Sequence, residues 1–471
     1  MLATIVKSGI HLANRYFLLR ALTIGFTIVI LGCVLVQTLH DLKKYPGIDM
    51  RSKVVGARLL IRGMDPYYDY RHELHSEHLR MLSDDTYSPA VLLCYRPLCE
   101  LDWRTQRNIY FCTDWIAVLL CYIAVRRSFP PHSPQVALWA AFVLLFVATL
   151  GFRLHLERGQ YYIELSLLIV MASVNMADKR CTCLRALPLA LLVVLRPTFL
   201  VCIFGLLLLR RARYAVYTTG LCILLFAATL PLTGVKGWMN YVKTVRANEQ
   251  NAQHAAYEEA GSPPLVMNPG IVEGFDFTRS LVMPGYLADR TLAGLARSSV
   301  SPALATLVHK VAPSEHQFRY LNTVCLIVIF SFDLAVLWCF QRSHTDDPIP
   351  IAFLFLAPLN LELFAPQHYA YCDVLILAPL LLILAASLNR WKRAGWVLYG
   401  AVLAVGSVIP WTAFYFNLHV QLASFFQYVG MLIILNGFSI WEAWKITKLS
   451  SRAQMHTNGT LLRTALSTLQ E

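Results

Sequence analysis

Three arginines stand at the ends of long apolar segments, where the chain carries few other charges. Arg153 and Arg158 lie between two apolar runs, and Arg196 precedes a proline between two others. A guanidinium can hold a phosphate through paired hydrogen bonds, so arginines at the edge of a membrane favour binding of a lipid phosphate. The alternative is that each arginine reaches to lipid headgroups or pairs with Glu157.

Polar residues continue from these arginines into the next apolar run. Arg153, Glu157, Gln160 and Glu164 follow a spacing of i, i+4, i+7 and i+11, which places them on one face of a continuous helix. A polar stripe that enters a membrane lines a cavity or forms a hydrogen-bonded seam between helices, and both interpretations stay open for Glu164.

The segment after the first apolar run is rich in carboxylates, which can accept a proton from a hydroxyl group. They are Asp41, Asp49, Asp65, Asp69, Glu73, Glu77, Asp84 and Asp85. His72, His75 and His78 step about 60° around a helix, so they do not converge and no metal site is expected. His368, close to Glu362 in sequence, either neutralises a ligand or caps a helix.

The composition indicates that these residues belong to a membrane protein. Of 471 residues, 57% are hydrophobic and 15% are charged, against roughly 25% charged residues in soluble domains. Apolar windows of about 17 to 25 residues recur, and each is long enough to cross a bilayer. The net charge of +13 sits at the ends of these windows, so it indicates membrane topology and no nucleic-acid partner.

The basic residues fix the expected orientation, because short cytoplasmic loops carry the excess of lysine and arginine. The sequence predicts an all-α polytopic protein of the plasma (inner) membrane, with a single integral domain over 1–471 and both termini in the cytoplasm. We expect about twelve transmembrane helices, near 17–39, 106–125, 134–152, 160–177, 184–195, 198–210, 213–232, 319–340, 349–365, 371–388, 394–415 and 421–444. Two large extracytoplasmic loops with interfacial helices, 40–105 and 233–318, and a cytoplasmic tail, 446–471, complete this topology.

Several motifs in this order resemble glycosyltransferase family 87, a branch of the GT-C membrane enzymes. They are Asp49 followed by Gly56-Ala57-Arg58-Leu59-Leu60 and Gly63-Met64-Asp65-Pro66-Tyr67, then Tyr87-Ser88-Pro89 with Arg96-Pro97-Leu98, Gly159-Gln160, Arg196-Pro197, and Asp289-Arg290-Thr291-Leu292-Ala293-Gly294 with Arg297. The aromatic residues that the family usually has after the first aspartate are replaced here by Met50 and Lys53.

The resemblance implies an inverting, metal-independent transfer of one sugar, mannose or arabinose, from a polyprenyl monophosphate donor. The acceptor would be a lipid-linked or glycan hydroxyl at the extracytoplasmic face, and no cofactor is expected beyond the donor. In this interpretation Asp49 is the catalytic base, with Asp41 as its substitute. Arg158, Arg196 and Arg153 bind the donor phosphate, and the substrate-binding residues are Gln160, Tyr67, His368, Glu157 and Arg297.

Two other classes of protein compete with this interpretation. A secondary transporter or lipid flippase could use the same arginines for a substrate in transit, but it would place charges near the bilayer midplane and often show related halves. A noncatalytic scaffold subunit would leave the arginines without a role. We keep the transporter or flippase as the main alternative.

Overall fold

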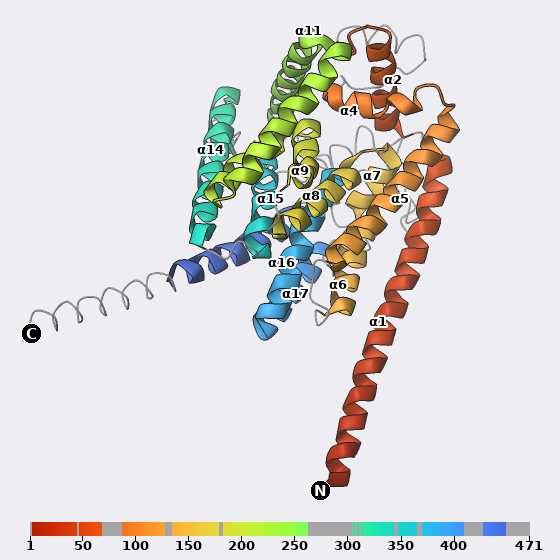
Figure 1. Cartoon of the computed structure of the whole chain (residues 1–471), viewed down its shortest axis with the longest axis vertical. Helices are drawn as coiled ribbons and strands as arrows, with labels where there is room; N and C mark the ends of the chain where they lie inside the picture. Colours follow the sequence, from red (N-terminus) through yellow and green to blue (C-terminus); the bar gives the residue numbers. More distant parts are fainter. Residues whose placement is uncertain are drawn as a thin grey trace, which may run out of the picture.

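A computed structural model of the chain shows a bundle of helices (Figure 1). The structure describes residues 2–44, 47–67, 87–127, 134–178, 182–261, 304, 307–308, 310–311, 314–342, 347–364, 370–408 and 427–448. These residues contain no β-strand, as expected for a chain whose backbone polar groups must be satisfied within each membrane segment.

The described residues form a series of α-helices along the chain. They are α1 (Leu2–Lys44), α2 (Ile48–Ile61), α4 (Pro89–Cys94), α5 (Trp103–Arg127), α6 (Gln135–Phe142), α7 (Leu150–Arg158), α8 (Tyr162–Ala177), α9 (Cys183–Leu195), α10 (Val201–Leu208), α11 (Ala212–Gly261), α14 (Glu315–Cys339), α15 (Pro348–Glu362), α16 (Leu377–Arg390), α17 (Lys392–Leu403) and a last helix, Gln427–Lys448. Short 3₁₀ segments occur at Arg96–Leu98, Pro197–Leu200, Phe340–Arg342 and Ala370–Ile376, and π-helical turns at Val143–Val147 and Ala404–Val408.

Six of these helices are long and apolar enough to cross a membrane, or seven if the bent pair that joins α6 to α7 forms one span. Five shorter apolar helices accompany them, among them α9 and the helical segment after Arg196-Pro197. The structure therefore confirms an all-helical chain with several spans and the predicted break at that proline. The total of twelve spans and the position of the termini stay predictions.

The bundle has a buried centre and an apolar outer surface. Of the 18 most apolar consecutive residues in the segment Cys372–Arg390, which contains α16, 94% are buried, whereas only 6% are buried in the corresponding stretch of α1 within Leu18–Lys43. Large apolar side chains of α1 such as Leu22, Val29 and Val36 are exposed. Such a continuous apolar surface is unfavourable in water and favourable in lipid. We infer that α1 packs at the edge of the bundle and that most of its surface faces the lipid.

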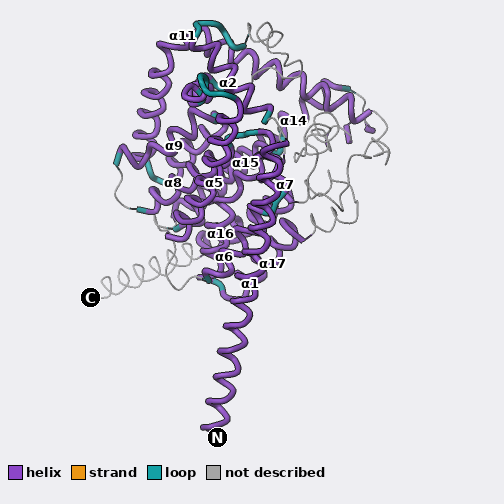
Figure 2. Tube along the Cα trace, turned by 90° about the vertical axis from the view of Figure 1, so that its right-hand side faces the viewer, coloured by secondary structure: helices purple, strands orange, loops and turns teal. Residues whose placement is uncertain are grey.

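The connecting segments gather at the two ends of the bundle. At one end, α2 and α4 lie beside the bend of α11, while α1 extends toward the opposite end (Figures 1 and 2). At the other end of the apolar helices, Arg185 pairs with Asp178 at 2.6 Å and Arg390 with Asp347 at 2.8 Å. Helices α8 and α9 therefore run antiparallel, and so do α15 and α16.

Helix α11 changes direction next to the expected start of the second loop. Its helical geometry breaks at Gly234, which has φ 62° and ψ 168°, two residues after the predicted end of the span at 232, and the chain is helical again up to Gly261. The ring centroids of Phe226 and Trp238 are 4.8 Å apart, although twelve residues of straight helix would separate them by about 18 Å. A glycine permits this bend because L-residues with a side chain rarely adopt positive φ.

Candidate active site

Asp49 lies in the first turn of α2, at the upper end of the bundle in Figure 1. The helix begins after Gly47, whose left-handed conformation (φ 61°) turns the chain sharply into α2. Asp49 is only 7% exposed. A buried carboxylate needs charged or hydrogen-bonding partners, and the positive end of the helix dipole supplies only part of that stabilisation.

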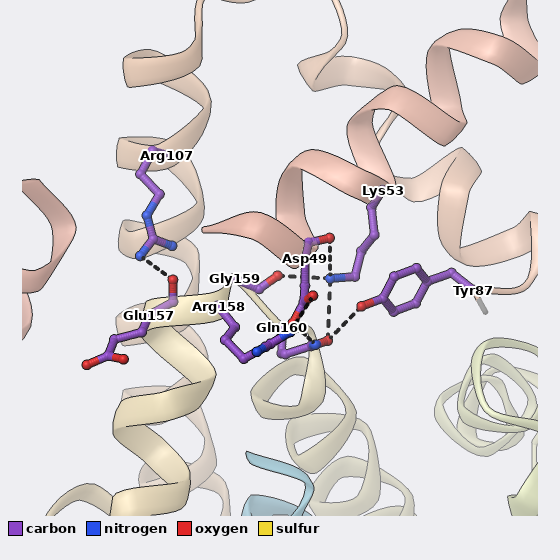
Figure 3. Close-up of polar contacts among 8 residues, drawn as sticks. All are labelled: Asp49, Lys53, Tyr87, Arg107, Glu157, Arg158, Gly159 and Gln160. Atoms are coloured by element: carbon purple, nitrogen blue, oxygen red, sulfur yellow. Dashed lines mark hydrogen bonds and ion pairs between the residues drawn. The ribbon is translucent and has the colours of Figure 1, made fainter. Parts of the chain in front are cut away.

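Two predicted site residues bind the Asp49 carboxylate directly (Figure 3). Arg158 donates from Nε to Oδ2 at 2.6 Å and from Nη2 to Oδ1 at 3.1 Å, so its guanidinium grips both oxygens. Gln160 donates from Nε2 to Oδ2 at 2.5 Å. The structure thus brings Asp49 into one compact polar site with Arg158 and Gln160, which follow it by more than 100 residues in the sequence.

Gly159 makes this arrangement possible and breaks the predicted polar stripe. It ends α7 with φ 71°, and α8 begins only at Tyr162, so residues 153–164 do not form the continuous helix that the spacing suggested. A Cβ atom on Gly159 would lie 2.6 Å from Cβ of Met50. The close approach of this turn to α2 lets Arg158 and Gln160 reach the same carboxylate.

Lys53 stands one helical turn after Asp49 and fastens α2 to the same turn. Its side chain is fully buried, and Nζ donates to the carbonyl oxygens of Asp49 at 3.1 Å and Gly159 at 2.9 Å, and to Gln160 Oε1 at 3.5 Å. Our sequence analysis did not include Lys53 among the site residues. The signal was present: a lysine at i+4 from the aspartate, where the family usually has an aromatic residue.

Aromatic rings surround the Lys53 ammonium group. Its Nζ lies 4.4 Å from the ring centroid of Tyr87, 5.4 Å from that of Tyr95 and 5.5 Å from that of Tyr161. Tyr87 also donates from its hydroxyl to Gln160 Oε1 at 3.2 Å. Burial raises the pKa of the Tyr95 hydroxyl well above its usual range, so this ring stays neutral beside the lysine. Cation–π contacts of this kind stabilise a buried ammonium group.

Tyr67 joins the site through this aromatic group. Its hydroxyl donates to the carbonyl of Tyr87 at 2.8 Å, and its ring lies 5.8 Å from that of Tyr241 in α11. Asn240 hydrogen-bonds Asp65 beside it. The predicted Gly-x-Asp-Pro-Tyr segment therefore connects the first loop to α11, and Tyr67 supports Tyr87.

Arg153 and Glu157 form a separate ion pair. Arg153 Nε lies 3.2 Å from Asp41 Oδ2 and 3.3 Å from Glu157 Oε1. The Glu157 carboxylate points away from Asp49 in Figure 3. Arg153 is therefore paired with Glu157, as the alternative interpretation expected. Arg153 is also paired with Asp41.

Arg107 also belongs to this region, and our sequence analysis missed it. It is buried in the second turn of α5, and its Nη2 donates to the carbonyl oxygens of Leu156 at 2.6 Å and Glu157 at 3.3 Å. These carbonyls belong to the last turn of α7, where a cation is favourable. Arg107 thereby holds the end of α7 from which Arg158 projects (Figure 3).

Arg196 occupies the predicted break after α9 and pairs with Glu362. Its Nε donates to Glu362 Oε1 at 2.8 Å, Nη2 lies 2.7 Å from Oε2, and Thr198 donates to Oε1 at 3.1 Å. The guanidinium also lies 4.7 Å from the ring centroid of Tyr162, two residues after Gln160. The second predicted phosphate-binding arginine is thus near the Asp49 site but held by its own carboxylate.

The other two predicted substrate-binding residues, His368 and Arg297, lie outside the described residues.

We expect Gly159→Ala to damage the site, with Gly63→Ala as its matched control. Both glycines have positive φ, 71° and 72°, so both alanines incur strain of about 1–2 kcal/mol. Only at Gly159 does the new Cβ strike Met50, whereas nothing lies within 4 Å at Gly63. The clash costs about a further 1–3 kcal/mol. Thermal unfolding in detergent should show Gly159→Ala less stable than Gly63→Ala, and equal unfolding temperatures would contradict this packing.

Comparison with known proteins supports one family. The sequence model of glycosyltransferase family 87 matches residues 86–331, just over half of the chain. The match includes Arg158, Gln160 and Arg196 but ends before Glu362 and begins after Asp49, so the structure alone connects those two acids to the matched region. No curated protein and no solved structure matches the chain.

Proposed function

Since this chain belongs to glycosyltransferase family 87, and is therefore a membrane glycosyltransferase of the GT-C type, we propose that it uses a polyprenyl monophosphate sugar as donor. The sugar is mannose or arabinose, and the acceptor is a hydroxyl of a lipid-linked molecule or glycan. The transfer inverts the anomeric carbon and takes place on the extracytoplasmic face of the plasma membrane. The observation that carries the proposal is the Asp49 carboxylate held by Arg158 and Gln160 at one end of an apolar bundle.

The proposed chemistry assigns opposite tasks to the acid and the arginines. Asp49 accepts the proton of the acceptor hydroxyl as its oxygen bonds to the anomeric carbon. The bond between that carbon and the phosphate oxygen breaks, and polyprenyl phosphate leaves with the bonding electron pair. Arginines stabilise the charge that grows on the phosphate. The prenyl chain lies among the apolar helices, because its hydrocarbon is more stable there than in water.

Arg158 connects the two tasks in this proposal. In the structure its guanidinium is bonded to both oxygens of Asp49, yet its side chain is 25% exposed. The donor phosphate competes with Asp49 for this arginine and draws it away, because phosphate and carboxylate fit the same paired geometry. Asp49 Oδ1 then loses its bond to Arg158 and can receive the acceptor's proton only when the donor is in place, while Gln160 keeps its bond to Oδ2.

Arg196 provides a second contact for the same phosphate. It lies against the ring of Tyr162, two residues after Gln160. Its guanidinium is paired with the Glu362 carboxylate, as that of Arg158 is paired with the Asp49 carboxylate. Both arginines are therefore kept charged and oriented by a carboxylate before the donor arrives.

Purified protein in detergent, given a radiolabelled polyprenyl monophosphate mannose or arabinose and extracted lipid or glycan acceptors, should form a labelled product. Mass spectrometry of polyprenyl-linked sugars and surface glycolipids that accumulate in a deletion strain identifies the sugar and the acceptor. If the protein instead moved a polyprenyl-linked sugar across sealed vesicles without transferring it, the transporter or flippase alternative would replace this proposal.

The proposed topology predicts which residues an impermeant thiol reagent reaches in intact cells. Single cysteines at Gly261 and Asp289 should be labelled without opening the membrane, whereas those at Arg180 and Arg393 should need permeabilisation. His254 lies 2.9 Å from Glu315, so the end of α11 and the start of α14 share one side of the bundle. Labelling at residue 261 only after permeabilisation would reverse the orientation and move the site to the cytoplasm.

A further inference from the structure

A second group of chemically active side chains lies outside the Asp49 site. Asp114 of α5, His155 of α7 and Glu164 of α8 each place a possible ligand atom within 4.8 Å of the others. His155 Nε2 is 3.2 Å from Asp114 Oδ1. These residues come from three different helices, so the tertiary packing has assembled them, and the mechanism proposed above uses none of them.

This cluster contains polar atoms that the fold leaves with few or no hydrogen-bond partners. Asp114 and His155 are fully buried. Among the described residues, His155 Nδ1 has no hydrogen-bond partner, and Asp114 Oδ2 and Glu164 Oε2 have none except each other's carboxyl group. The hydroxyl groups of Tyr95 and Tyr110 beside them likewise have only each other. Each unsatisfied buried group costs about 1–3 kcal/mol, so several poorly satisfied groups at one place indicate that a ligand with many bonds belongs there.

We propose that Asp114, His155 and Glu164 bind one divalent metal ion. Ligands bound at about 2.0–2.2 Å with tetrahedral angles are roughly 3.3 Å apart, which is close to the 3.2 Å between His155 and Asp114. The Glu164 ligand atom lies within 4.8 Å of the other two and would move closer to them to complete a three-residue site. Two carboxylates and a neutral imidazole also balance the charge of a dication, which a buried site requires.

The donor set selects the class of metal. Imidazole suits zinc and other late transition metals, whereas carboxylates suit manganese, magnesium and calcium. A site with one imidazole and two carboxylates therefore fits Zn²⁺ or Mn²⁺. Calcium prefers six to eight oxygen ligands and magnesium keeps several waters, and neither suits three buried residues that include a histidine.

Nearby cations limit the strength of binding without preventing it. Lys53 and Arg107 both exert their charge on this cluster. Both cations repel a dication. The direct bonds must outweigh that repulsion, and apparent binding free energies of about 10–16 kcal/mol for structural zinc show that such bonds can.

The metal has a structural task in this position. It joins α5, α7 and α8, and the last two helices flank the Gly159–Gln160 turn that reaches Asp49. It therefore holds the base of the Asp49 site and takes no part in sugar transfer. The proposal does not depend on the identity of the donor or acceptor.

Metal analysis of the full-length protein tests this proposal directly. Protein purified in detergent without chelators should contain about one zinc or manganese per chain by mass spectrometry of the digested protein. A double variant, Asp114→Asn with His155→Gln, should retain less than about one tenth of it. Asp333→Asn is the matched control, because Asp333 is an equally buried acid in the apolar helix α14, hydrogen-bonded to Asn360, and should keep the metal.

Two measurements on the wild-type protein keep the test decisive if the double variant fails to fold. Stripping with a chelator should lower the unfolding temperature by several degrees, and Zn²⁺ or Mn²⁺, but not Mg²⁺, should restore it. X-ray absorption at the edge of the bound metal should show nitrogen and oxygen ligands without sulfur. Wild-type protein with under about one tenth of a metal per chain, and no change in unfolding temperature on adding either ion, would overturn the proposal.

Discussion

Asp49→Asn should lower the rate of sugar transfer by about a hundredfold or more while the protein still folds and binds its donor. Asparagine has the size of aspartate and can accept hydrogen bonds from Arg158 and Gln160, but it cannot take up the acceptor's proton, and loss of a general base costs about 10²–10⁴ in rate. Because the variant no longer competes for Arg158 with a full negative charge, its affinity for the donor should equal or exceed that of the wild type.

Steady-state turnover and donor binding by the purified variant measure both parts of this prediction. Asp102→Asn is the matched control: Asp102 is exposed at the start of α5, and hydrogen bonds from Thr105 lower its pKa, so it is another ionised acid of the same loop with no contact to Asp49. It should transfer sugar at the wild-type rate. If Asp49→Asn retains near wild-type turnover while Asp41→Asn is inactive, Asp49 is not the base.

Arg158→Ala should weaken donor binding and lower kcat/KM by roughly 30-fold to several thousandfold. Removing one member of a hydrogen-bonded charge pair at a site costs about 2–5 kcal/mol, and each 1.36 kcal/mol corresponds to a factor of ten. Arg158→Lys should fall between the alanine variant and the wild type, because lysine keeps the charge but loses the paired geometry. Arg196→Ala and Arg196→Lys should follow the same order.

Arg390→Ala is the control for these variants, because it removes an arginine–carboxylate ion pair without removing a proposed phosphate contact. Arg390 binds Asp347 at 2.8 Å at the other end of the bundle, so its removal also leaves a carboxylate unpaired without touching the proposed donor site. Transfer by this variant should stay at the wild-type level once the amount of folded protein is equalised. Unchanged donor affinity and turnover in both Arg158→Ala and Arg196→Ala would remove these arginines from the site.

The identity of the site residues was largely predictable from the sequence, but the contacts between them were not. Asp49, Arg158 and Gln160 were all named as site residues from the sequence, yet no sequence pattern paired Asp49 with Arg158. The spacing even suggested that Arg153 and Gln160 share a helical face, whereas the left-handed Gly159 ends α7 between them. The turn at Gly159 therefore decides that Arg158 contacts Asp49, while Arg153 contacts Glu157.

The sequence by itself determined the helical membrane class, most helix positions and the break at Arg196-Pro197, because these follow from local properties. Apolar length decides which segments favour lipid, and proline removes a backbone donor wherever it stands. Only the tertiary structure decided that Lys53 holds Gly159, that Glu362 holds Arg196, and that Asp114, His155 and Glu164 meet. Those contacts join residues far apart in the chain, and they depend on how the helices pack against one another, which no local pattern specifies.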